Sequence, residues 1–290
     1  SITLLRKVSP WFDSLFESGI IKSPIVLHVV DLNAFTILMD CIHERNEYPL
    51  SIPLYTLAMI ASLVDFLDCA KSLDFLPKIW IDALWKHQNW SFQRDVVLWI
   101  YITQVFKDSP KHKLATRSAI MLWPHRFNAL GLHIKRSFVD ELNWLREKSM
   151  SAVLAPLQNL AEELRFGQSA YDFEQEALIL GTIHQMFPPI YFVPSELIRD
   201  CCSISQIVEE ITNVKEPSGG GPSLRQRLNR LLGVDYFWEY GLEFGAIVAE
   251  TKAVAQGLKG LDLRSDDSDG DEYGYEKIEH GDGDNGGQST

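Results

Sequence analysis

A Ser-Pro pair at Ser9-Pro10 constrains the fold of this chain more than any other feature, because it sets where a helix begins. Serine is a good N-cap, and proline is favoured at the first position of a helix. Apolar side chains recur at helical spacing both before and after the pair. We therefore predict two short helices that meet at Ser9-Pro10. Their apolar positions are Leu4, Leu5, Val8, Trp11, Phe12, Leu15 and Phe16.

A strand and a series of amphipathic helices are predicted after this pair. The apolar run Ile25-Val26-Leu27-His28-Val29 predicts the strand. Apolar residues then recur at helical spacing over about residues 31–44, 53–67 and 68–86. Asp31 is a suitable N-cap for the first of these helices. We expect a core that contains Trp11, Phe12, Leu15, Phe16 and Phe35.

The order of these elements resembles a BTB/POZ domain over about residues 1–86. Such domains bind other proteins and perform no chemistry. The resemblance implies a helical cluster with a small sheet, although the opening β-hairpin and first helix of the family are absent from this sequence. The residues that carry it are Leu4-Leu5, Ser9-Pro10-Trp11-Phe12, Leu15-Phe16, Ile25-Val26-Leu27, Phe35, Leu38, Ile42, Leu54, Leu57-Ala58, Asp65 and Asp68-Cys69.

Three regions follow from these patterns. We predict an α+β fold that begins with an N-terminally truncated BTB/POZ-like domain at residues 1–88. A mainly α-helical region is predicted at 89–261, where stretches around Trp99 and Leu178 resemble the region after the BTB domain in many fungal proteins. A disordered acidic tail is predicted at 262–290, since a segment rich in Asp, Glu, Gly and Ser cannot bury enough apolar area to offset its ordering entropy.

Charge and cysteine usage exclude several classes of protein. The net charge is −12, and residues 262–290 hold ten acidic residues against two basic ones. An acidic chain without a basic stripe is not expected to bind nucleic acid directly. The four cysteines form no C-x-x-C pair, which favours a reducing intracellular compartment, the cytoplasm or the nucleus. No uninterrupted run of 18 apolar residues and no signal peptide is visible, so no membrane association is expected.

No motif predicts catalysis, a cofactor or a bound metal. The G-x-G-x-x-G spacing at Gly281, Gly283 and Gly286 lies among acidic residues, without the strand and helix that a dinucleotide site requires. Asp267, Asp269 and Asp271 alternate as calcium-loop ligands do, but the glycine and the final glutamate of that loop are missing. We therefore nominate no catalytic, cofactor-binding or metal-binding residue and expect no enzymatic activity.

Two pairs of residues have a more specific interpretation. Ser265 and Ser268 stand among aspartates, a context that suits acid-directed kinases, and we predict that one or both are phosphorylated; a plain solubilising tail is the alternative. Ile20 and Lys22 align with the motif through which many BTB domains bind cullin scaffolds. Lys22 stands where the family has Glu, and a reversed charge in such a contact costs several kcal/mol.

The sequence thus predicts a protein–protein interaction module that binds partners, or a second copy of itself, through the BTB-like domain. A substrate adaptor of a cullin-type ubiquitin ligase is one alternative. A transcription-related scaffold that acts through its partners is another, since no DNA-binding element is visible.

Overall fold

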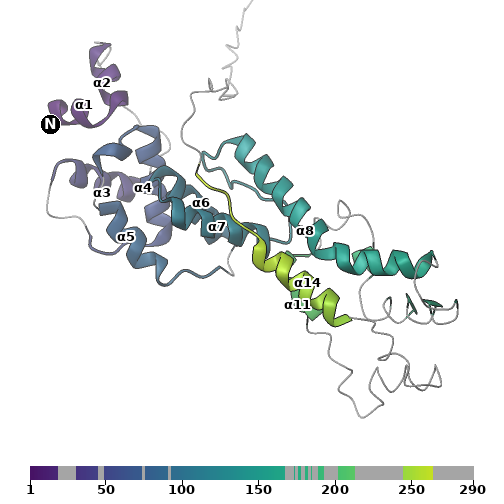
Figure 1. Ribbon diagram of the computed structural model, residues 1–290. Helices are drawn as coiled ribbons and strands as arrows, with labels where there is room; N and C mark the ends of the chain where they lie inside the picture. The colour runs from purple at the N-terminus through teal and green to yellow at the C-terminus, as the bar shows by residue number, and fades with distance from the viewer. Residues whose placement is uncertain are drawn as a thin grey trace, which may run out of the picture.

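The computed structural model describes residues 1–18, 31–44, 49–73, 76–90, 93–166, 173, 176–177, 180–181, 184, 189–192, 202–212 and 244–263. Helices stack along the length of this part of the chain, which is elongated (Figure 1). The α-helices are α1 (Ile2–Val8), α2 (Pro10–Glu17), α3 (Leu32–Ile42), α4 (Leu54–Phe66), α5 (Leu76–Trp85), α6 (Gln93–Val105), α7 (Ser109–Leu122), α8 (Arg136–Arg165), α11 (Ile204–Thr212) and α14 (Phe244–Gly257). Two short 3₁₀ helices are η1 (Ala70–Ser72) and η2 (Pro189–Phe192).

The predicted helix starts at Ser9 and Asp31 are confirmed. The Phe12 N–H donates to Ser9 Oγ at 3.3 Å, with Pro10 in the first turn of α2. The Ala34 N–H donates to Asp31 Oδ1 at 3.0 Å and so caps α3. In each cap the side chain accepts from a backbone N–H only three residues further along the chain. The sequence alone therefore locates both helix starts.

Ser9 also ties α2 to the rest of the protein. Its side chain is buried, and its hydroxyl donates to the carbonyl of Leu67, just after α4. Ser9→Ala removes both the cap and this long-range bond, so we expect it to lower the free energy of unfolding by about 1–2 kcal/mol. Urea denaturation measures this loss. The exposed Ser14→Ala, on the same helix, should change stability by less than about 0.5 kcal/mol, and equal losses would contradict this role of Ser9.

The core is centred on α6, which packs against both α4 and α7. All eight residues from Val96 to Thr103 are buried, so α6 is covered on every side. A helix that is apolar around its whole circumference must lie inside a fold. On one side α4 also packs against α3 and α5, and on the other α7 packs against α8 and α11. The core therefore runs without interruption past residue 88, where the first predicted boundary lies.

At the other end of the stack, α14 packs against α8 and α11. Helix α8 has 30 residues and carries Pro156 in its interior. Proline lacks the N–H that would bond the preceding turn, and Figure 1 shows α8 changing direction part-way along its length. The Tyr191 hydroxyl donates to Glu210 Oε2 at 2.7 Å and links η2 to α11.

The predicted α+β class is wrong, because the described residues form helices and contain no strand and no sheet. A strand needs a neighbour to satisfy its backbone N–H and C=O groups, and none of the described segments offers one. The predicted strand at residues 25–29 and most of the predicted acidic tail lie outside the described residues. Of the five aromatic and aliphatic residues predicted for the core, only Phe12 is buried; Trp11, Leu15, Phe16 and Phe35 are half-buried against its edge.

Candidate protein-interaction surface

An aromatic cluster joins α2 to the end of α4 and runs from the core to the surface. The Trp11 ring lies 5.0 Å from Phe12, nearly perpendicular to it, and 5.2 Å from Phe66. Phe16 stacks on Phe12 at 6.0 Å. Phe12 is 4% exposed, whereas Phe66 is 54% exposed. The cluster therefore presents aromatic surface to solvent from a position that the core holds fixed.

Helix α1 packs against α2 and adds exposed apolar side chains at this end of the protein. None of its residues is buried, and Ile2 is 60% exposed, while Leu4, Leu5 and Val8 are half-buried. In Figure 1 α1 and α2 stand at the N-terminal end, outside the stack formed by the other helices. We call the aromatic cluster together with Ile2 the N-terminal face.

Charged side chains lie beside the N-terminal face. Arg6 Nε donates to Asp13 Oδ1 at 2.6 Å, and Arg6 Nη2 lies 3.4 Å from Glu17 Oε1. Hydrogen bonding to Asp13 raises the pKa of Arg6. Ion pairs this exposed add little to stability. An apolar centre with charged groups at its margin is the usual composition of a protein–protein interface.

The predicted site residues Ile20, Lys22, Ser265 and Ser268 all lie outside the described residues. The chain is described up to Ser18, which follows α2 and donates from its hydroxyl to the carbonyl of Leu15 at 2.7 Å. The predicted cullin contact therefore begins two residues after the last described residue of this segment.

Within the described ranges, the groups that could perform chemistry do not converge. Burial raises the pKa of Cys41 to about 11 and that of Cys69 to about 12, so both thiols stay protonated at neutral pH. His133 Nδ1 lies 3.3 Å from Asp65 Oδ2 on an exposed surface. No group of three or more His, Cys, Asp or Glu side chains in this part of the chain could hold a metal ion.

A cavity of about 360 Å³ lies between the start of α6, the end of α7 and the start of α11. Its walls hold indole, hydroxyl and carboxamide groups, and none of its lining residues is Asp, Glu, His, Lys or Cys. Ser203 and Gln206 form a capping box there, because each side chain bonds the other residue's backbone N–H. The lining residues are Trp90, Gln93, Val96, Ser118, Leu122, Trp123, Pro124, Ser203, Ser205 and Gln206.

Behind this cavity lies Arg146, a residue that the sequence analysis missed. Its guanidinium donates to the carbonyls of Trp123 at 2.9 Å, Pro124 at 2.8 Å and Cys202 at 3.0 Å. The side chain is 2% exposed. One signal was available, since Arg146 lies four residues after Leu142 and four before Met150, on the buried face of α8.

No family model matches the chain, and neither a curated protein nor a solved structure matches it. The resemblance to the BTB/POZ family therefore stays a prediction. Among the helices described, none is both long enough and apolar enough to span a bilayer.

Proposed function

We propose that this chain is a protein–protein interaction module and that it self-associates through the N-terminal face. The observation that carries the proposal is the exposure of Phe66, which is 54% open to solvent while its ring contacts Trp11. Aromatic side chains held in place by a core are typical anchors of protein interfaces, because they lose little rotational freedom on binding. The ordered motifs from Leu4 to Cys69 support the same function through their resemblance to a BTB/POZ domain.

Two further observations favour binding over catalysis. The acids, bases and thiols of the described residues are dispersed, and the walls of the cavity beside α11 are neutral. Cys41 and Cys69 are free thiols, which supports a reducing environment such as the cytoplasm or nucleus.

Phe66→Ser tests the proposal. We expect this variant to weaken self-association about 10- to 30-fold, because it removes an aromatic anchor from the centre of the face. Phe166→Ser is the matched control, since Phe166 is 69% exposed at the far end of α8. It should change association by less than about twofold. Sedimentation equilibrium measures both dissociation constants, and circular dichroism verifies that both variants are folded.

Equal dissociation constants for the two variants would contradict the assignment to the N-terminal face. Ile2→Ser provides a second variant on the same face that removes no buried side chain. Co-purification of a cullin scaffold with the wild-type chain would instead identify the adaptor alternative, and co-purification of a DNA-bound protein would identify the scaffold alternative.

A further inference from the structure

Ser-Pro pairs occur three times in this chain, at Ser9-Pro10, Ser23-Pro24 and Ser109-Pro110. The first lies at the start of α2 and the third at the start of α7, whereas the second lies outside the described residues. Proline-directed protein kinases transfer phosphate to a serine that is followed by proline. The surroundings of each hydroxyl therefore determine which of the two described pairs such an enzyme could use.

The hydroxyl of Ser9 is part of the packed structure. Ser9 is 1% exposed, and its Oγ accepts from the Phe12 N–H as the N-cap of α2. The same hydroxyl donates to the carbonyl of Leu67, just after α4. A kinase could reach this oxygen only after α2 had separated from α4. Ser9 therefore provides an internal reference for a protected Ser-Pro pair.

In α7 a different residue caps the helix, so the serine hydroxyl has no structural role. The Lys111 N–H donates to Asp108 Oδ1 at 3.2 Å, and the Asp108 N–H donates to the Thr103 carbonyl at 2.9 Å. These two bonds fix the turn between α6 and α7 and leave Ser109 as the first residue of α7. Ser109 and Pro110 are both exposed, and no hydrogen bond to another described residue holds the Ser109 hydroxyl.

The first turn of α7 can open far enough for an enzyme to bind it. Kinases hold the residues around the reacting serine in an extended conformation, so this turn has to unwind locally. The first N–H groups of a helix lack partners within the helix, and a residue that precedes proline disfavours the helical conformation. Helix ends also open at a lower free energy than the core. Opening at Ser109 leaves the buried helix α6 in place.

The carboxylates nearest to Ser109 are paired, so they do not oppose a phosphate there. Asp108 Oδ2 and Asp82 Oδ1 lie 2.7 and 2.8 Å from Lys111 Nζ, which balances part of their charge. A phosphoserine carries a charge of about −1.5 to −2 at pH 7. The first turn of a helix is the positive end of its dipole and stabilises an anion. The folded chain can therefore accommodate a phosphate on Ser109.

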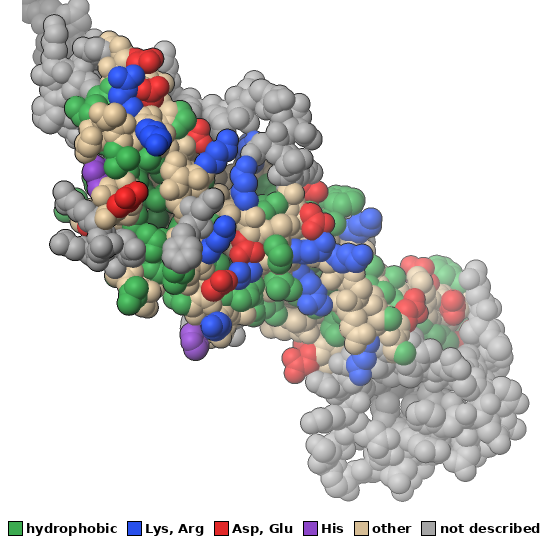
Figure 2. All heavy atoms as spheres, turned by 60° about the vertical axis from the view of Figure 1, so that its left-hand side comes forward, with side chains coloured by type: hydrophobic (Ala, Val, Ile, Leu, Met, Phe, Trp, Pro, Cys, Tyr) green, Lys and Arg blue, Asp and Glu red, His purple; other side chains and the backbone are tan. Residues whose placement is uncertain are grey.

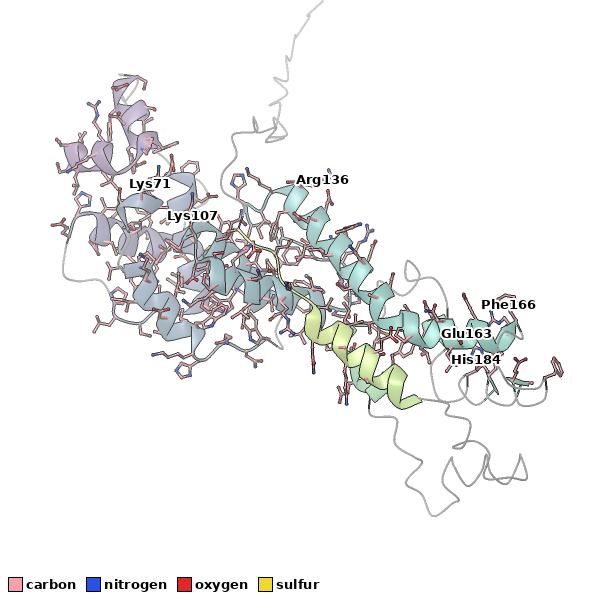
Figure 3. All side chains as sticks on the ribbon, viewed as in Figure 1. Lys71, Lys107, Arg136, Glu163, Phe166 and His184 are labelled. Atoms are coloured by element: carbon pink, nitrogen blue, oxygen red, sulfur yellow. The ribbon has the colours of Figure 1, made fainter. Side chains whose placement is uncertain are left out.

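Two other lysines lie along this stretch of the chain. Figure 3 labels Lys107, which lies in the turn that leads from α6 into α7. Lys113, one turn after Ser109, bonds the Asp262 carboxylate at 2.8 and 2.9 Å. Figure 2 shows one face of the protein, where lysine and arginine side chains lie interspersed with acidic ones. No unpaired lysine is needed for phosphorylation at Ser109, because the exposed hydroxyl is the reacting group.

We propose that Ser109 is a phosphorylation site for a proline-directed protein kinase. The kinase's catalytic aspartate accepts the proton of the Ser109 hydroxyl as Oγ attacks the γ-phosphorus of ATP. The Oγ–P bond forms, the bond from this phosphorus to the bridging oxygen of the β-phosphate breaks, and ADP leaves. The reaction replaces a neutral hydroxyl at the start of α7 with a dianionic group. Helix α7 is not part of the N-terminal face, so this site does not depend on self-association.

Incubation of the full chain with ATP and a cyclin-dependent kinase tests the proposal, with phosphopeptide mass spectrometry to measure the rate at each serine. A synthetic peptide of residues 103–115 gives the rate at Ser109 without the fold. We expect the folded chain to react at Ser109 within about tenfold of the peptide, because only the first turn of α7 has to open. Ser9 should react at least about a hundredfold more slowly than Ser109, since it is buried.

Two comparisons show whether the enzyme reads the Ser-Pro pair. Pro110→Ala keeps the hydroxyl at the start of α7 and should slow the reaction at Ser109 at least about tenfold. Ser137 is an exposed serine in the first turn of α8 that no proline follows, and it should react at least about tenfold more slowly than Ser109. Circular dichroism verifies that the variant is folded. A Ser109 that stays unmodified in the folded chain, reacts equally fast after Pro110→Ala, or reacts no faster than Ser9 and Ser137 would overturn the proposal.

Discussion

Arg146→Ala is expected to lower the free energy of unfolding by about 3–5 kcal/mol, the largest effect among the substitutions considered for this chain. The buried guanidinium donates to three carbonyls, those of Trp123, Pro124 and Cys202. Alanine would leave these acceptors unsatisfied, and each buried unsatisfied polar group costs about 1–3 kcal/mol. Water entering the space left by the side chain would recover part of this cost. Guanidinium chloride denaturation measures the loss.

Two further substitutions distinguish the loss of these hydrogen bonds from a general effect of changing a residue in α8. Arg146→Lys keeps the charge but lacks the planar fork of donors, so its loss of stability should lie between those of the wild type and Arg146→Ala. Lys148→Ala removes an exposed cation 4.9 Å from the Trp144 ring and should cost only about 0.5–1 kcal/mol. If Arg146→Ala were no more damaging than Lys148→Ala, the guanidinium would not be holding the loop after α7 to α11.

Stability should also fall steeply between pH 6.5 and pH 4, because of His112. Burial lowers the pKa of this histidine from 6.5 to about 4, although a backbone hydrogen bond at Ile100 and the charge of Asp262 act in the opposite direction. The side chain is 1% exposed, and its Nε2 has no hydrogen-bond partner in the described structure. Protonation would therefore place in the core a charge that these two interactions compensate only in part.

The sign of the pH effect follows from proton linkage. Well above pH 6.5 both folded and unfolded chains hold His112 neutral, so this histidine contributes no pH dependence to stability there. Between pH 6.5 and about 4 the unfolded chain binds a proton that the folded chain does not, and stability falls as the pH falls. The loss from pH 7 to pH 4 should be about 3 kcal/mol.

His112→Asn removes the titrating group while retaining a polar side chain beside Thr103, whose Oγ1 lies 3.1 Å from His112 Nδ1. Chemical denaturation at several pH values should give a flatter stability curve for this variant than for the wild type. The control is His125→Asn, because His125 is exposed, and it should retain the wild-type slope. Parallel curves for His112→Asn and the wild type would contradict the buried neutral state of His112.

Features of the fold that depend on nearby residues could be read from the sequence. The caps at Ser9 and Asp31 bond N–H groups three residues away, and the apolar spacing over residues 31–44 and 53–67 locates α3 and α4 to within two residues. The expected sheet is absent from the described residues, because a strand forms only with a partner, and a partner cannot be inferred from the apolar run at Ile25 alone. The full burial of α6 was also missed, since it results from packing by α4 and α7 together.

The candidate interaction surface was predicted in part. The sequence analysis identified Trp11, Phe12 and Phe16 but assigned them to the core, whereas Phe66 was not singled out. Whether an aromatic ring is buried depends on which element packs over it. Phe66 is the last residue of α4, and the elements that bury the rest of this helix leave its ring exposed. The bond between Asp262 and Lys113 spans 149 residues, a separation at which no local pattern carries information.

Light scattering after size-exclusion chromatography is the most direct test of self-association through the N-terminal face. The wild-type chain would be measured over about a hundredfold range of concentration, since an oligomer's apparent stability depends on concentration. The expected result is a molar mass that rises toward twice that of one chain, and that Phe66→Ser shifts back toward one chain. A mass of one chain at every concentration would contradict the account.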